Sequence, residues 1–138
     1  MIRTSLTALA FAALAASAAS AQAAEATPDQ VVAHHIQAAS AKDVEAAVSD
    51  YADDAVVLTP TSTVQGKAAI RSLFQGMWSG PGGAFDSKQL AAVGDVGSTQ
   101  WVMNPGKPGS VTGKDVFIVR HGKIMVQTVF IGGPPAQP

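Results

Sequence analysis

The chain has 138 residues, with 9 Lys and Arg against 10 Asp and Glu, a formal net charge of −1 and no cysteine. With no excess or stripe of basic residues, we expect neither nucleic acid nor an anionic membrane surface as a partner. Without cysteine no disulfide can form, so a hydrophobic core has to stabilise the fold unaided.

Residues 1–23 have the pattern of a secretory signal peptide. Arg3 precedes an apolar run over residues 6–16, and the segment ends in the small-x-small pattern Ala-Gln-Ala at 21–23. A membrane anchor is the alternative, but the run is shorter than the ~20 strongly apolar residues that a spanning helix needs. We therefore expect cleavage after Ala23, a periplasmic or secreted protein, and no membrane segment in the mature form.

The first helix after this segment is predicted by its start signal. Thr27 can cap the helix, Pro28 suits its first position, and Gln30 completes a capping box. At 100° per residue, His35 falls inside the apolar arc of this helix, whereas His34 lies at its polar edge.

Two further helices are indicated by apolar stripes. The second starts at about residue 41 and ends at Asp53-Asp54, and the third follows Gly66 and ends at the glycine-rich residues 79–83. We interpret Asp53 and Asp54 as turn and capping groups rather than as a catalytic acid pair, because adjacent residues on an extended chain point in opposite directions. The two stripes consist of Val44, Ala47, Val48 and Tyr51, and of Ile70, Leu73, Phe74 and Met77.

Strands follow the helices. Residues 55–59 and 63–65 are expected to form a small antiparallel hairpin, and from Ala84 the apolar period becomes two. Gly122 suits a position with φ > 0 in the tight turn between the last two strands. Helices followed by a meander predict an α+β domain at 24–131, with the helices on one face of an antiparallel sheet, and a disordered tail at 132–138. The strands expected in the meander are 85–93, 98–103, 111–120 and 123–131.

The last two strands are apolar on both faces. Asp115, Phe117 and Val119 alternate with Val116 and Ile118, and the next strand has the same character. An antiparallel sheet usually leaves one face to water. One face should meet the helices, and a second copy of the chain across a two-fold axis most simply covers the other. We predict a homodimer; the alternative is a monomer whose flanking loops cover the outer face.

Three segments, AKDVEAAVSDYADDAVVLTP, GKAAIRSLF and GKDVFIVRHGKIMVQTVF, carry a resemblance to a known superfamily. Over about residues 28–131 the chain resembles the NTF2-like superfamily, in particular its SnoaL-like, DUF4440-type and ketosteroid-isomerase-like branches. The resemblance implies a cystatin-like cone, in which three helices and a strongly curved mixed or antiparallel sheet enclose an apolar pocket for a small hydrophobic molecule. It does not fix the activity, because the superfamily includes isomerases, dehydratases, cyclases, epoxide hydrolases and non-catalytic scaffolds.

The resemblance also implies where the site lies. Ketosteroid isomerases carry a general-base carboxylate immediately before the proline that corresponds to Pro60, whereas this chain has Thr59, whose hydroxyl cannot act as that base. The family's phenol position on the first helix corresponds to His35, and its protonated carboxyl corresponds to Asp115. Burial raises the pKa of a carboxyl in an apolar pocket, so Asp115 could donate a hydrogen bond to a carbonyl.

Asp115 and His35 are therefore the candidate catalytic residues. The alternatives are a solvated Asp115 paired with Lys114 or Lys123, and a buried structural His35 bonded to a carbonyl. If both side chains face the pocket, they can form an acid–base pair in which Asp115 orients the imidazole.

The candidate ligand contacts are inward-facing residues of the sheet together with Thr59. Gln127 needs a polar partner there, either a ligand or Asp115. Large apolar side chains supply the wall, and Trp78 and Met125 are available as well. The candidates are Thr59, Trp101, Met103, Phe117, Gln127 and Val129.

Neither a metal nor a cofactor is expected. His34 and His35 diverge by about 100° on a helix and cannot chelate together, and no phosphate-binding or nucleophile motif occurs. Three functions stay open: acid–base chemistry on a small hydrophobic carbonyl or hydroxyl compound, of isomerase, dehydratase or hydrolase type; non-catalytic binding of a small apolar ligand; or an assembly module with a vestigial pocket.

Overall fold

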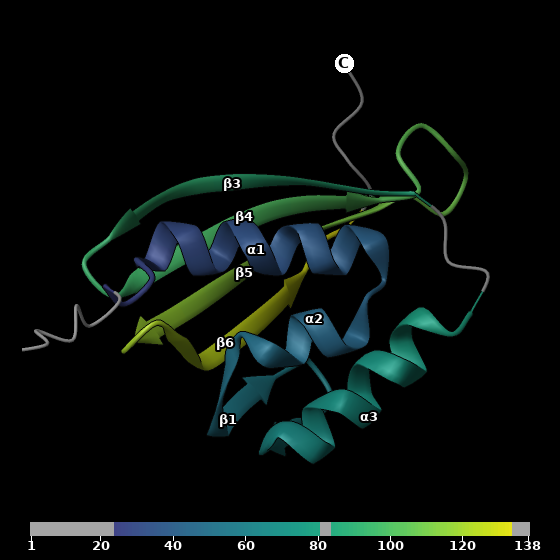
Figure 1. Cartoon of the computed structure of the whole chain (residues 1–138). Helices are drawn as coiled ribbons and strands as arrows, with labels where there is room; N and C mark the ends of the chain where they lie inside the picture. The colour runs from purple at the N-terminus through teal and green to yellow at the C-terminus, as the bar shows by residue number, and fades with distance from the viewer. Residues whose placement is uncertain (1–23, 81–83, 134–138) are drawn as a thin grey trace, which may run out of the picture.

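A computed structural model describes residues 24–80 and 84–133 of the chain (Figure 1). The predicted signal peptide and the last five residues of the expected tail lie outside this part. The elements are α1 (Pro28–Ala41), α2 (Val44–Ser49), β1 (Tyr51–Leu58), β2 (Thr63–Gln65), α3 (Lys67–Trp78), β3 (Phe85–Val93), β4 (Val96–Met103), β5 (Val111–Arg120) and β6 (Lys123–Ile131).

The strands form one six-stranded sheet in the order β2-β1-β6-β5-β4-β3. Only β1 and β6 run parallel; the other neighbours are antiparallel. Pairing shifts register within β1, β3 and β5, and such irregularities bend and twist a sheet. In Figure 1 the sheet curves around α1, while α2 and α3 lie on the side of β1. The predicted fold class, helices on one face of a curved mixed sheet, is confirmed.

The start of α1 is built as its sequence predicts. Thr27 Oγ1 accepts from the backbone nitrogen of Gln30 at 3.4 Å, and Gln30 Oε1 accepts from the backbone nitrogen of Thr27 at 2.9 Å. This capping box fixes the phase of the helix, which buries Val31, Val32 and His35 against the sheet and leaves His34 exposed.

The junction between α2 and β1 differs from the expectation. The second helix ends at Ser49, and the chain is already a strand at Tyr51, so the predicted strand start at residue 55 is wrong. Asp53 and Asp54 are exposed inside β1, not in a turn or cap, in the stretch where the pairing with β6 shifts register. Asp53 instead forms an ion pair with Lys67 at 3.1 Å.

The remaining strands agree with the period-two pattern. Only β4 differs, starting at Val96, two residues before its expected start. The turn between β5 and β6 has positive φ at both His121 (51°) and Gly122 (67°), the geometry that matches the twist of a two-residue hairpin. Gly132 and Gly133, expected in the tail, are hydrogen-bonded to Thr112 of β5.

The core lies between the helices and the inner face of the sheet. It joins α1, α2 and α3 to β1, β5 and β6 through fully buried side chains, which bury apolar surface from both layers. The largest of these are Tyr51, Phe117, Ile70, Ile124, Val32 and Val48.

Candidate functional site

A cavity of about 370 Å³ opens beside this core, within the range typical of small-molecule sites. Residues of α1, α3, β1, the β1–β2 loop and strands β3 to β6 line it. Most of the lining is apolar, and the ionisable side chains in it are His35, Lys42 and Asp115. The other lining residues include Val57, Thr59, Leu73, Phe74, Met77, Trp78, Phe85, Trp101, Met103, Gln127, Val129 and Ile131.

Asp115 is oriented by two donors from neighbouring strands. Trp101 of β4 donates from Nε1 to Oδ1 at 3.0 Å, and Gln127 of β6 donates from Nε2 to Oδ2 at 3.0 Å. Burial raises the pKa of this carboxyl above its ordinary value, while the two hydrogen bonds and the charge of His35 act in the opposite direction. The side chain therefore faces the cavity, whereas Lys114 faces the outer groove and Lys123 donates to the carbonyl oxygen of Ser49.

His35 is almost fully buried, with 4% of its surface exposed, but it also lines the cavity. Its Nε2 lies 3.5 Å from the hydroxyl of Tyr51, and its Nδ1 lies 3.7 Å from Oδ2 of Asp50. The ring packs edge-on against Tyr51 and Phe117, each with a centroid separation of 5.4 Å. Two aromatic neighbours and two polar partners fix the orientation of this imidazole.

His35 and Asp115 are connected through two intermediate side chains. Tyr51 donates from its hydroxyl to Oε1 of Gln127, and Gln127 in turn donates to Asp115. The polar chain thus runs from Asp50 to His35, Tyr51, Gln127 and Asp115. Asp115 does not bond the imidazole itself: Nε2 lies 3.5 Å from the hydroxyl of Tyr51, and Nδ1, which makes no hydrogen bond, lies 3.7 Å from Asp50.

Sequence reasoning missed Asp50 and Tyr51. The apolar spacing places Tyr51 on the second helix, but it is the first residue of β1 and is fully buried. Burial, together with the charges of Asp115 and Asp50, raises the pKa of its phenol well above the ordinary value. One available signal is that a buried tyrosine hydroxyl usually has a hydrogen-bond partner. Oδ1 of Asp50 is hydrogen-bonded to Nδ1 of His34 at 2.7 Å, so the two adjacent histidines both lie against the carboxylate of Asp50.

Thr59 lines the cavity, but its hydroxyl is used locally. Oγ1 accepts from the backbone nitrogen of Ser62 at 3.0 Å and lies 2.9 Å from the Ser62 hydroxyl. These bonds close the β1–β2 turn. Thr59 is therefore a turn-stabilising residue at the edge of the cavity.

The other predicted contacts divide into two groups. Trp101, Met103, Gln127 and Val129 line the cavity, as does Trp78. Phe117 is fully buried in the core against His35 and is not among the lining residues, and neither is Met125. Phe117 shares its strand face with Asp115 but lies further along β5, where the helices close over the sheet.

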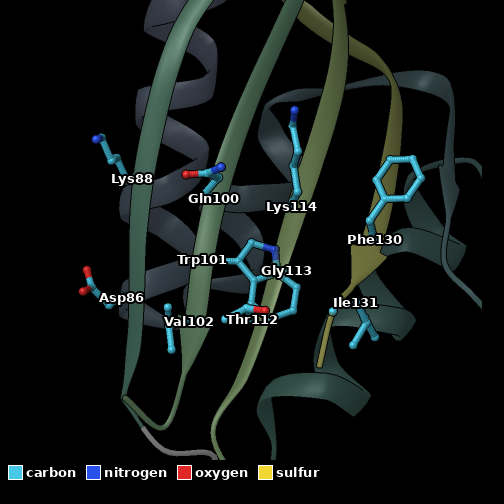
Figure 2. Close-up of a pocket in the computed structure, with 11 residues that line it drawn as sticks. Asp86, Lys88, Gln100, Trp101, Val102, Thr112, Gly113, Lys114, Phe130 and Ile131 are labelled. Carbon is cyan, nitrogen blue, oxygen red and sulfur yellow. The ribbon is translucent and has the colours of Figure 1, made fainter. Parts of the chain in front are cut away.

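The opposite face of the sheet carries a second hollow, an outer groove of about 560 Å³ (Figure 2). Polar ends of Lys88, Gln100 and Lys114 extend over the strands there, and α1 lies behind the sheet in this view. Phe130, which is 54% exposed, forms the apolar side of the groove. Trp101 also lines the groove, because Gly113 beside it has no side chain to cover the indole ring.

Within residues 24–80 and 84–133, no three His, Cys, Asp or Glu side chains are arranged to hold a metal ion. None of the helices described there has the length and apolar character needed to cross a bilayer.

Several solved structures share this architecture. An NTF-2 like protein of unknown function from Burkholderia xenovorans LB400 is 21% identical, with a TM-score of 0.68 over 80% of this chain and 87% of that one. A proposed ketosteroid isomerase from Kribbella flavida DSM 17836 is 16% identical, with a TM-score of 0.65 over 80% and 82% of the two chains. A proposed polyketide cyclase from Sinorhizobium meliloti is 24% identical, with a TM-score of 0.61 over 72% and 92%. At these identities the likeness shows the fold alone.

Sequence comparison gives the family. No curated protein matches the chain. A family model for the SnoaL-like domain matches residues 32–127, which run from the buried face of α1 to Gln127 and include every member of the polar chain. The chain therefore belongs to the SnoaL-like domain family and has the NTF2-like fold.

Proposed function

We propose that this SnoaL-like protein binds a small hydrophobic carbonyl or hydroxyl compound in the cavity and performs cofactor-independent acid–base chemistry on it. The reaction would be an isomerisation, dehydration or hydrolysis, with Asp115 and His35 as the polar pair. The observation that carries the proposal is the partly buried carboxyl of Asp115, held by Trp101 and Gln127 in an otherwise mostly apolar cavity. The names of the structural neighbours, an isomerase and a cyclase, belong to the same broad chemistry.

The chemistry follows from the environment of Asp115. A carboxyl whose pKa is raised by burial can stay protonated and donate a hydrogen bond to a carbonyl oxygen. Negative charge that develops on that oxygen in the transition state would strengthen this bond more than in the ground state. His35 lines the same cavity, but its ring nitrogens face Tyr51 and Asp50, so it would influence the reaction through the polar chain that joins it to Asp115.

Non-catalytic binding of a small apolar ligand is the second candidate, and Thr59 favours it. The residue before Pro60 has no carboxylate, and its hydroxyl is engaged with Ser62. If no other group removes a proton from the ligand, the cavity would serve a carrier or a sensor.

Deuterium exchange into 2-tetralone separates the two candidates. This hydrophobic ketone has exchangeable protons next to its carbonyl, so exchange in D2O, followed by NMR, reports acid–base chemistry without knowledge of the natural substrate. We expect the protein to accelerate exchange, and Asp115→Asn to lower the acceleration by about 100-fold, the lower end of what a positioned acid or base contributes. Asp86→Asn, the same change on the outer face of the sheet, should leave the rate unaltered.

Binding of 2-tetralone without accelerated exchange would favour the second candidate. Absence of binding, measured by calorimetry at millimolar ketone, would contradict both. Equal exchange rates for the wild type and Asp115→Asn would remove Asp115 from the reaction.

We also propose that two copies associate through the outer face of the sheet. The support is a row of outward apolar side chains on β4, β5 and β6 that none of the helices within residues 24–80 and 84–133 covers. The row consists of Val96, Val116, Ile118, Val126 and Phe130. An assembly module would use the same face, and the exchange experiment distinguishes it from an enzyme.

Export is the remaining proposal. It is supported by the sequence of residues 1–23 alone. Mass spectrometry of the protein recovered from outside the cytoplasm should give an N-terminus at Ala24, and an intact Met1 in that fraction would contradict cleavage.

A further inference from the structure

The polar chain between Asp50 and Asp115 has a defined hydrogen-bond direction. Trp101 is a donor only, so Oδ1 of Asp115 accepts from it. The amide nitrogen of Gln127 donates to Oδ2, which turns the amide oxygen toward Tyr51. Tyr51 then uses its single hydroxyl proton to bond that oxygen.

The direction of these hydrogen bonds limits which ring nitrogens of His35 carry a proton. With its proton committed to Gln127, the Tyr51 oxygen can only accept, so Nε2 of His35 must carry a proton to interact with it at 3.5 Å. Nδ1 faces Oδ2 of Asp50 at 3.7 Å, and each of these two atoms is buried with no hydrogen bond. A proton on Nδ1 turns this contact into an attractive one, because a carboxylate only accepts. We take an ionised Asp115 with a His35 protonated on both nitrogens as the first of two proton arrangements.

The same side chains also fit the opposite direction. If Asp115 is protonated, its proton lies on Oδ2, because Oδ1 accepts from Trp101. A half-turn of the Gln127 amide then lets its oxygen accept from Asp115 and its nitrogen donate to Tyr51. Tyr51 in turn donates to Nε2 of His35, which is now neutral with its proton on Nδ1. Both arrangements contain the same number of protons: the first has one more proton on His35, and the second has one more on Asp115.

We propose that Tyr51 and Gln127 are positioning residues that couple Asp115 to His35, so that protonation of Asp115 is linked to loss of a proton from His35. In one state Asp115 is a carboxylate and the imidazole is charged; in the other Asp115 is a carboxylic acid, whose proton bonds Gln127, and the imidazole is neutral. The use of this coupling in catalysis rests on the proposed function, but the coupling itself is a property of the ligand-free protein.

The surroundings of His35 contain few other charges. Oδ2 of Asp50, at the end of α2, lies 3.7 Å from Nδ1, and the other oxygen of Asp50 bonds His34. Phe74 of α3 and Phe117 of β5 are apolar neighbours, and Asp115 acts on the ring from β5. Lys42 of the α1 C-cap lines the same cavity. Asp115 is thus the partner whose protonation reverses the chain.

Asp115→Asn imitates the second state. Its side-chain oxygen must accept from Trp101, so its nitrogen points to Gln127 and forces the amide half-turn. We expect the midpoint of the His35 titration, followed by ¹⁵N NMR of histidine-labelled protein without ligand, to fall by about one pH unit or more, a tenfold change in proton affinity. Asp86→Asn should leave it in place.

Tyr51→Phe separates coupling through the chain from simple charge attraction, because it removes the hydroxyl and leaves every charge in place. In the Tyr51→Phe background, Asp115→Asn should lower the midpoint of the His35 titration by less than half of the decrease that it causes in the wild-type background. Equal effects of Asp115→Asn with and without Tyr51 would overturn the proposal, and so would the absence of any effect in the wild-type background.

A second measurement needs no substitution and covers the case in which Tyr51→Phe does not fold. Two coupled groups titrate in steps that belong to the pair. The ¹³Cγ shift of Asp115 and the ¹⁵N shifts of His35 in the wild type should therefore show the same inflections. Separate single midpoints would contradict the coupling whether or not the protein accelerates exchange into 2-tetralone, so the two proposals can fail independently.

Discussion

At the scale of single residues, the environment of Asp115 has a consequence for stability. Its pKa is raised above the ordinary value of 3.8 mainly by burial, so the native state binds the proton more tightly than the unfolded chain does. The stabilisation is complete below about pH 3.8 and is lost as the pH rises through the native pKa.

Asp115→Asn should remove this dependence. The free energy of unfolding of the variant, relative to wild type, should increase as the pH is raised from about 4 through the native pKa of Asp115, by about 1.4 kcal/mol for each unit of elevation. Urea unfolding over a pH series measures it. For Asp86→Asn, on the exposed outer face, we expect no such rise; a flat difference for Asp115→Asn would show that burial does not control this carboxyl.

The residues of the site differ in how far sequence can predict them. Asp115 and His35 are predictable because strand alternation and the helical arc give the direction of a side chain. Tyr51 and Asp50 are not, because an i+7 position of an apolar stripe is equally consistent with the start of a strand. The bond between Tyr51 and Gln127 spans 76 residues of sequence, and no local pattern encodes such a contact.

At the scale of elements, β4 and β5 depend on one close approach. Trp101 lies across Gly113 of the neighbouring strand, where an added Cβ would come within 2.0 Å of the indole. Only a residue without a side chain lets the ring reach Asp115. The period-two pattern predicts both strands but gives no reason for a glycine inside one of them.

Gly113→Ala should therefore displace the indole and weaken its bond to Asp115. We expect a loss of roughly 1–3 kcal/mol in unfolding free energy, the cost of overpacking, measured by urea denaturation followed by far-UV circular dichroism. Gly76→Ala in α3, where an added Cβ meets nothing within 4 Å, should stabilise by up to about 1 kcal/mol through helix propensity. A neutral Gly113→Ala would mean that the ring can move away without cost.

Element boundaries are predictable where a chemical signal marks them. The capping box at Thr27 and the turn at Gly122 fix the start of α1 and the hairpin between β5 and β6. The start of β1 has no such signal, since α2 runs into it with only Asp50 between them. The error there also misplaces Asp53 and Asp54.

At the scale of the whole molecule, the uncovered outer face predicts association. Val116→Lys places a charge among Val96, Ile118 and Val126 and should convert a dimer to a monomer in size-exclusion chromatography with light scattering. Gln75→Lys adds the same charge to exposed α3 and should leave the dimer intact. A wild-type monomer at micromolar concentration would contradict the proposed interface.

Trp101 belongs to the walls of both hollows, the inner cavity and the outer groove. The other tryptophan, Trp78, lines only the inner one. In a Trp78→Phe protein, the fluorescence of Trp101 would therefore respond both to a ligand in the inner cavity and to a second protein copy on the outer face. Adding a cavity ligand and an outer-face partner in separate titrations would show whether binding on one face of the sheet changes binding on the other face.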